Sequence, residues 1–337
     1  MYKYYILIFL SLILLLLFKI HYIRLANLLN LYDIPDFKRK IHHKKVPLVG
    51  GPLVYIFFLF VVFFDILYLD KINTNLLFEK NGEFLIFLSF SSIFFLIGIY
   101  DDKFNLRADK KLFLYFFVIC FFLIVNNNLL IKDLKFSFLN EIFFLNKFSF
   151  VFTALAILLF LNSLNMFDGI NLQSALYVLF FFFILFFKFN YNFIFLLLII
   201  FLFFFLLLNN KNKFFMGESG INFLGFILSY FTILAYNKKI INFADEIFLI
   251  MCIPGFDLLR LSISRLYHGK HPFSADKNHI HHNLLKKFDP RTVAFVIFFI
   301  ITFPYILFLI FNSVLLSILF SFIIYCLTLS NLVLKKK

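Results

Sequence analysis

Residues 193–208 read FIFLLLIIFLFFFLLL, an uninterrupted apolar run between two asparagines. A helix that crosses a lipid bilayer needs about 17 to 25 mostly apolar residues, so this run with its flanks predicts a membrane-spanning helix. Similar runs fill most of the chain, which is 63% hydrophobic and only 15% charged over 337 residues. A soluble globular domain cannot bury that much apolar surface, and the composition therefore predicts a protein with many membrane spans.

We predict an all-α, polytopic membrane helix bundle that forms a single integral membrane domain over residues 1–337, with about eleven transmembrane helices. The N-terminal run is expected to stay as the first span, because no small-residue cleavage site follows it. The stretch from 126 to 150 is too polar to span and is expected to form an external loop with a small hairpin. The predicted spans are residues 4–22, 51–69, 84–100, 112–128, 149–166, 173–189, 192–209, 220–236, 243–262, 292–311 and 313–333.

Most of the 32 Lys and Arg residues fall in loops on one side of this topology. Basic loops stay in the cytoplasm, so the N-terminus is predicted outside and the C-terminus in the cytoplasm, in the inner (cytoplasmic) membrane. The formal net charge of +14 then reflects this bias and a surface that favours anionic ligands and lipid head groups. Nucleic acid is excluded as a partner, because the sequence contains no soluble basic module.

Polar segments interrupt the apolar runs on the predicted cytoplasmic side. Loops between spans need only be soluble, whereas these segments concentrate carboxylates, amides, imidazoles and lysines. They indicate an active site at the membrane surface. The segments are residues 33–51, 101–111, 162–171, 215–225 and 254–282.

Asp101 and Asp102 follow an apolar helix at the membrane boundary. The pair can be read as a solvated helix stop, or as Mg²⁺ ligands with one carboxylate acting as a base. Adjacent residues on a helix point about 100° apart, so we expect the two carboxylates to have different roles. Lys111, at the start of the next helix, is placed to contact a phosphate.

Asn162, Asn165 and Asp168 recur at every third position, which keeps them roughly on one face of a helix. Hydrogen bonds between helices would explain the amides. A carboxylate at the edge of the membrane favours a partner or a ligand, and Asp168 is therefore a candidate binding residue.

Two further segments carry candidate ligand groups. Residues 215–220, FMGESG, form a glycine-flanked acidic turn before a helix expected from Ile221, and the helix start offers N–H groups to an anion. Residues 276–282, DKNHIHH, contain three imidazoles, for which phosphate or carboxylate partners, a zinc site and a solvated loop remain open. Carboxylates for Mg²⁺ and basic groups for phosphate, together at membrane level, indicate phosphoryl transfer to a lipid.

In these segments the chain resembles the polyprenyl-phosphate N-acetylhexosamine-1-phosphate transferase superfamily, glycosyltransferase family 4. It is most similar to the branch that uses UDP-GlcNAc and undecaprenyl phosphate. The motifs that carry the resemblance are Arg39-Lys40-x-His42, Pro47-x-x-Gly50-Gly51, Gly98-x-x-Asp101-Asp102, Lys111-Leu112, Asn162-x-x-Asn165-x-x-Asp168-Gly169, residues 215–220 before Leu224-Gly225, Pro254-x-x-Asp257, and Asp276-x-x-His279-x-His281-His282.

The resemblance implies transfer of an N-acetylhexosamine 1-phosphate, with GlcNAc 1-phosphate expected first, from a UDP-sugar to undecaprenyl phosphate. This releases UMP, requires Mg²⁺ or Mn²⁺, and is the first lipid-linked step of cell-wall or lipopolysaccharide glycan synthesis. Membrane lipids and a second copy in a homodimer are the other implied partners. The implied metal ligands are Glu218, Asp101 and Asp102, which with His279 are the catalytic residues, and the implied substrate-binding residues are His42, Lys111, Asn165, Asp168, Gly169, Phe215, His281 and His282.

The chain departs from the family pattern at several positions. Glu218 stands where the family normally has Asp, Ile221 where it has Ser, Asn171 where it has an acidic residue, and Leu172 where it has Gly. A phospho-MurNAc-pentapeptide transferase of peptidoglycan synthesis and an inactive homologue therefore remain as alternatives. A transporter would place ionisable groups deep in the spans, and the apolar runs are nearly free of them.

Overall fold

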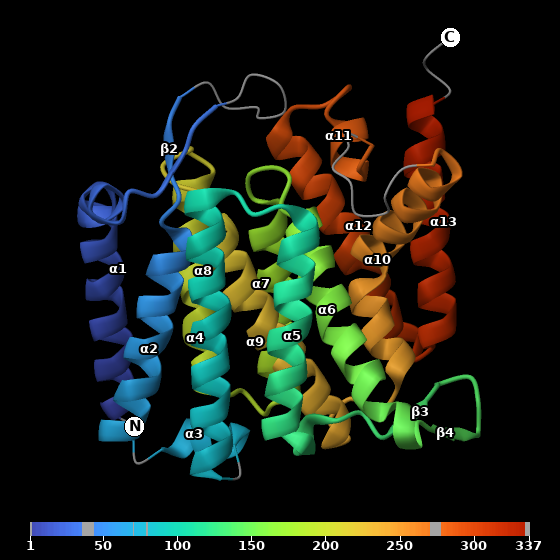
Figure 1. Ribbon diagram of the computed structural model, residues 1–337, viewed down its shortest axis with the longest axis horizontal. Coiled ribbons are helices and arrows are strands. Elements are labelled where there is room, and N and C mark those ends of the chain that lie inside the picture. The colour runs from blue at the N-terminus through green and yellow to red at the C-terminus, as the bar shows by residue number, and fades with distance from the viewer. Residues whose placement is uncertain (1, 36–43, 70, 79, 270–277, 334–337) are drawn as a thin grey trace. The chain divides into compact units, whose positions relative to one another are not determined.

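The computed structural model describes residues 2–35, 44–69, 71–78, 80–269 and 278–333 (Figure 1). These residues belong to two compact units. Unit 1 comprises residues up to Leu106, 124–126 and 178–231, and unit 2 comprises 107–123, 127–177 and the residues from Thr232 onward.

Helices make up nearly all of the regular structure, and every predicted span falls on one of them. Because the predicted runs are long, apolar and separated by polar turns, the sequence locates these helices well. The helices are α1 (Tyr2–Leu29), α2 (Gly50–Tyr68), α3 (Ile72–Leu77), α4 (Asn81–Phe104), α5 (Ala108–Val125), α6 (Ser149–Phe167), α7 (Gln173–Lys188), α8 (Phe193–Asn209), α9 (Gly217–Asn237), α10 (Ala244–Tyr267), α11 (Ile280–Leu284), α12 (Pro290–Phe311) and α13 (Val314–Val333).

Within the described residues, seven helices are long and apolar enough to cross a membrane, and α7, α8 and α13 are shorter apolar helices. The all-α polytopic membrane fold is therefore confirmed. The number of spans, the sides of the two termini and the single domain stay predictions.

Unit 1 is built around the first part of α9, which packs against α2 and α4. Phe223 contacts Tyr55 and Phe58 of α2, with ring centroids 5.3 and 5.5 Å apart. Phe226 stacks on Phe94 of α4 at 4.8 Å. Aromatic side chains bury large areas without polar groups, so this Phe-rich sequence forms a dry core around α9.

The start of α9 lies unusually close to the backbones of α2 and α4. The N–H groups of Gly50 and Gly51 donate to the carbonyls of Phe215 (2.9 Å) and Met216 (2.8 Å). A Cβ atom on Gly98 of α4 would lie 2.3 Å from Cα of Ser219. Gly50 and Gly51 of α2 and Gly98 of α4 come from two separate sequence motifs. They all allow the backbone at the start of α9 to approach closely.

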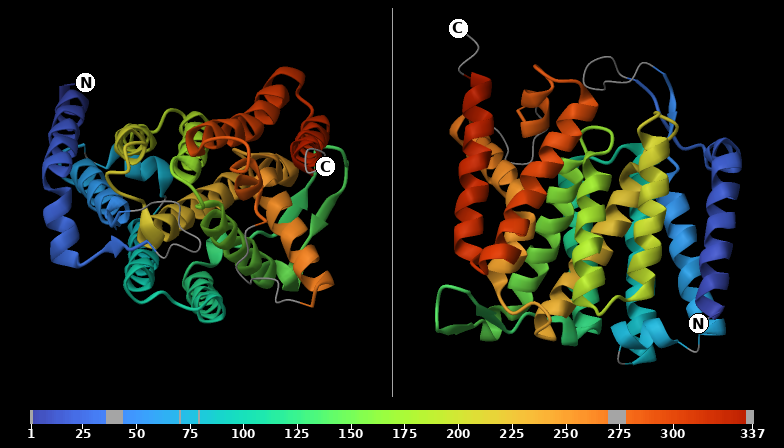
Figure 2. Two further views of the ribbon diagram at one scale, coloured as in Figure 1. Left: turned by 90° about the horizontal axis from the view of Figure 1, so that it is seen from above. Right: turned by 180° about the vertical axis from the view of Figure 1, so that it is seen from behind.

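Unit 2 contains α6, α10, α12 and α13, with α10 packed against the other three. The connection before α6 forms the antiparallel hairpin of β3 (Asp133–Lys135) and β4 (Ile142–Phe144), so the predicted hairpin is confirmed. The right-hand view of Figure 2 shows this hairpin at the end of unit 2 opposite the short helix α11. In unit 1, β1 (Tyr32–Asp33) pairs antiparallel with β2 (Val46–Pro47).

We predict that Gly98→Ala destabilises the protein by about 1–3 kcal/mol, because the added methyl group meets backbone atoms that cannot move aside. Gly82→Ala in the same helix is the matched control, since a Cβ there has nothing within 4 Å. Thermal unfolding of the purified protein in detergent measures both effects. Equal midpoints for the two variants would contradict the close approach of α4 to α9.

Candidate active site

In unit 1, Asp102 caps the start of α9. Its carboxylate oxygens accept hydrogen bonds from the backbone N–H groups of Glu218 (2.8 Å) and Ser219 (3.0 Å). The first N–H groups of a helix have no partner inside the helix and carry partial positive charge, so a carboxylate stabilises them. The helix begins at Gly217, earlier than the predicted Ile221, and the anion at its start is a side chain of the protein itself.

Asp101 has different partners from Asp102, as the angular offset along the helix predicts. It is 6% exposed, and its Oδ1 accepts a hydrogen bond from the N–H of Leu106 at 2.7 Å. Asp101 therefore stabilises the turn that ends α4, whereas Asp102 reaches across to α9.

Asp102 and half-buried Glu218 form a pair of carboxylates close enough to repel each other. Mg²⁺ is usually bound by one or two carboxylates together with substrate phosphates and water, so the donor set of this pair fits Mg²⁺ or Mn²⁺. In the part of the chain that the structure describes, no three His, Cys, Asp or Glu side chains are grouped to hold an ion. The other ligands of an ion held by this pair would be oxygen atoms of water or substrate.

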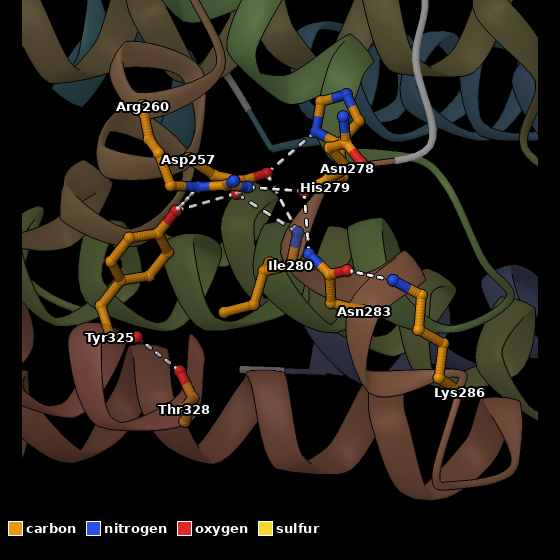
Figure 3. Close-up of polar contacts among 9 residues, drawn as sticks. All are labelled: Asp257, Arg260, Asn278, His279, Ile280, Asn283, Lys286, Tyr325 and Thr328. Carbon is orange, nitrogen blue, oxygen red and sulfur yellow. Dashed lines mark hydrogen bonds and ion pairs between the residues drawn. The ribbon is translucent and has the colours of Figure 1, made fainter. Parts of the chain in front are cut away.

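In unit 2, Asp257 of α10 organises a polar network around α11 (Figure 3). It is 3% exposed, and each of its oxygens accepts more than one hydrogen bond. A buried carboxylate is stabilised when its oxygens are fully hydrogen-bonded. Its donors are Arg260 (2.7 Å), Nδ1 of His279 (2.8 Å), Tyr325 (2.9 Å) and the N–H of Ile280 (3.2 Å).

This network fixes the orientation of His279. A carboxylate surrounded by donors acts only as an acceptor, so Nδ1 of His279 carries the proton in this hydrogen bond. The other ring nitrogen, Nε2, is left to interact with a ligand. Arg260 also donates to the carbonyl of Asn278 at 2.6 Å, which holds the residue before His279 in place.

The three imidazoles of the sequence motif lie together. The rings of His279 and His281 are nearly parallel with centroids 5.4 Å apart, and His281 and His282 are 4.3 Å apart. Burial, and then the neighbouring His282 and His279, lower the pKa of His281 to about 3, so it is neutral near pH 7. Its Nδ1 has no hydrogen-bond partner among the described residues.

The loop after α6 packs against this histidine cluster. A Cβ atom on Gly169 would lie 2.1 Å from Nε2 of His281, so only glycine admits the ring. The exposed carboxylate of Asp168 accepts a hydrogen bond from the hydroxyl of Ser174. Leu172, which lies between Asp168 and Ser174 in the sequence, has a φ of 71°, in the left-handed region that favours glycine.

A small hollow lies beside Asp257 and His279. Its walls combine these polar groups with apolar side chains, as is usual for binding sites. The lining residues are Ser163, Met166, Phe167, Pro254, Asp257, Leu258 and His279.

Comparison with known proteins shows which family the chain resembles. Residues 84–236, which contain Asp101, Asp102, Asp168 and Glu218, match the family described as glycosyl transferase family 4. This stretch of the chain is similar to that family. The histidine cluster lies outside the matched range.

Curated relatives cover most of the chain. A probable undecaprenyl-phosphate N-acetylglucosaminyl 1-phosphate transferase of Bacillus subtilis (strain 168) is 28% identical over 271 residues, 78% of this chain and 72% of that protein. Undecaprenyl-phosphate alpha-N-acetylglucosaminyl 1-phosphate transferases of Yersinia pestis and Escherichia coli (strain K12) are each 27% identical, over 81% of this chain and 74% of their own length.

The structure brings the predicted site residues together in two groups. Unit 1 holds Asp101, Asp102, Phe215 and Glu218, and the N–H of Phe215 donates to the carbonyl of Pro47 at 2.9 Å. Unit 2 holds a second group. Its members are Asp168, Gly169, His279, His281 and His282.

Three predicted residues stand apart from these groups or outside the described chain. The ammonium group of half-buried Lys111 lies 5.8 Å from the ring centroid of Tyr115. Asn165, in the last turn of α6, accepts the N–H of Asp168 through its backbone carbonyl at 3.2 Å. His42 lies outside the described residues.

No role was predicted from the sequence for Asp257, Arg260 or Tyr325. A signal for the first two was present, because Asp257 and Arg260 are opposite charges three positions apart inside an apolar span. Tyr325 gave no signal, since a tyrosine near the end of a span is common in membrane proteins.

We predict that Asp257→Asn destabilises the protein by about 2–4 kcal/mol, because an amide NH₂ would face donors that now point at a carboxylate. The control is Asp109→Asn, which breaks the exposed Arg107–Asp109 ion pair and should change stability little. Thermal unfolding in detergent compares the two. If Asp257→Asn lowers the unfolding midpoint no more than Asp109→Asn does, the network around Asp257 does not stabilise the protein.

We predict that the stability of the protein falls below pH 6.5 and that His281→Leu reduces this fall. The pKa of His281 is about 3 in the folded chain, and a histidine in the unfolded chain has the ordinary value of 6.5. The unfolded chain therefore binds more protons between these two pH values. Stability is then lost on acidification by up to about 1.4 kcal/mol per pH unit. Unfolding midpoints measured at several pH values give the change of stability with pH, and exposed His21→Leu is the control. An unchanged slope in His281→Leu would exclude this residue as the cause.

Proposed function

We propose that this protein transfers an N-acetylhexosamine 1-phosphate, most specifically GlcNAc 1-phosphate, from a UDP-sugar to undecaprenyl phosphate and releases UMP. The names of its relatives support the acceptor and the sugar. The observation that carries the proposal is the carboxylate pair Asp102 and Glu218 at the start of α9, inside the family match.

The acidic pair is assigned to a divalent cation. This assignment is supported by the repulsion between the carboxylates of Asp102 and Glu218, which a cation would relieve. When bound, Mg²⁺ or Mn²⁺ would neutralise charge on the diphosphate of the donor. Asp102 would keep Glu218 in position through the hydrogen bond to its backbone N–H, and Asp101 would stabilise the turn beside them.

The reaction itself is a displacement at phosphorus. A phosphate oxygen of undecaprenyl phosphate forms a bond to the phosphorus that carries the sugar, and the bond from that phosphorus to the UMP oxygen breaks. Such transfers depend mainly on positioning and electrostatic stabilisation by the protein.

The histidine cluster of unit 2 is assigned to the diphosphate or the sugar. Nε2 of His279 is the nitrogen that Asp257 leaves for a ligand, and neutral His281 can accept or donate one hydrogen bond without a charge. Asp168, Gly169 and Asn165 are assigned to the nucleotide, with Phe215 at the uracil. Lys111 and His42 are assigned to phosphate groups.

The proposed setting is the inner membrane, with catalysis on the cytoplasmic side, where UDP-sugars are available. The product is a lipid-linked sugar, which suits the first step of cell-wall or lipopolysaccharide glycan synthesis. The basic loops of the chain support this orientation. A homodimer is also part of the proposal.

Purified protein with undecaprenyl phosphate and Mg²⁺ is expected to release UMP from UDP-GlcNAc. A panel of UDP-sugars tests the donor, and release only from UDP-MurNAc-pentapeptide would favour the peptidoglycan enzyme instead. No UMP from any donor would indicate an inactive homologue.

We predict that Glu218→Gln and Asp102→Asn each lower the rate of UMP release at least about a hundredfold, because each removes a charge next to the diphosphate. The matched control is Glu141→Gln, which changes an exposed carboxylate on the loop between β3 and β4. Turnover of Glu218→Gln at the wild-type rate would rule out that side chain as an essential metal ligand.

A further inference from the structure

The hairpin before α6 exposes an unusual number of large apolar side chains. A loop in water normally carries polar side chains, and a contiguous apolar patch marks a contact surface. The residues concerned, with their exposed fractions, are Phe138 (52%), Leu139 (39%), Ile142 (45%), Phe143 (44%), Phe144 (69%) and Phe148 (75%).

The backbone of the hairpin is fixed to the ends of two helices. The N–H of Lys135 donates to the hydroxyl of Tyr236 at 2.8 Å, near the end of α9. The N–H of Ser137 donates to the carboxylate of Asp245 at 3.0 Å, at the start of α10. Asp245 is 4% exposed, so this contact is built into the fold.

A third attachment lies at the start of α6, where Thr153 accepts the N–H of Ile131 at 2.9 Å. α6, α9 and α10 are all among the helices long and apolar enough to cross a membrane. The ends of such helices lie where the bilayer meets water. The hairpin is therefore held at the level of the membrane interface.

The exposed apolar surface continues from the hairpin along α6. Phe148 directly precedes the helix, and Val151, Leu155 and Leu159 follow with exposed fractions of 52%, 45% and 48%. In a spanning helix these side chains face lipid. Exposed Lys132 and Lys147 flank the hairpin, and their ammonium groups suit the phosphates of lipid head groups.

We propose that the β3–β4 hairpin is inserted into the interfacial layer of the bilayer. Phe138, Phe143 and Phe144 lie among the first methylene groups of the acyl chains, and Lys132 and Lys147 bind head-group phosphates. Lipid therefore covers the exposed apolar side chains of the hairpin. The hairpin anchors the end of unit 2 that lies opposite the histidine cluster.

The absence of tryptophan from the chain makes a direct test simple. Phe144→Trp introduces a single fluorescent reporter into the full-length protein with little change in shape. The protein is reconstituted into vesicles of phosphatidylcholine and phosphatidylglycerol, with or without bromine on the acyl chains. We expect blue-shifted emission, strong quenching by the brominated lipid and weak quenching by aqueous iodide.

Two matched reporters calibrate the result. Leu159→Trp marks the lipid-facing side of α6, and Lys211→Trp marks an exposed loop between α8 and α9. Behaviour of Phe144→Trp like that of Lys211→Trp would overturn the proposal, because the hairpin would then lie in water. Blue-shifted emission that brominated lipid does not quench would also overturn it, because a second copy of the chain would then cover the patch.

Discussion

The carboxylate of Asp102 and the first N–H groups of α9 form the contact on which the arrangement of unit 1 depends. A helix end in apolar surroundings leaves N–H groups that water cannot reach, and each unpaired group costs about 1–3 kcal/mol. Asp102 pairs two of them and at the same time brings α4 to the start of α9. The glycines of α2 and α4 then allow the backbones to close around that contact.

Unit 2 uses the same physical device at another helix. Asp257 accepts the N–H of Ile280 at the start of α11, and it also holds the ring of His279. In both units a carboxylate caps a helix that carries side chains of the candidate active site. A carboxylate in this position has two effects, because it stabilises the helix start and fixes the neighbouring functional groups.

The sequence predicts the helices well and the contacts between them poorly. The spans and the hairpin follow from long apolar runs and a polar gap, which depend only on neighbouring residues. The sequence makes Asp102 a candidate site residue, but its pairing with Glu218 and Ser219 joins positions 116 and 117 residues apart. No local pattern contains that information. The same holds for Tyr325, whose partner Asp257 is 68 residues away.

The left-handed backbone at Leu172 has a consequence for recognising distant relatives. A side chain with a Cβ atom is disfavoured at φ 71°, yet the main chain adopts this bend without glycine. The bend is therefore imposed by the surrounding loop and not by the identity of the residue. Search patterns that demand glycine at this point would pass over chains of this type, whereas a comparison of backbone angles would still group them.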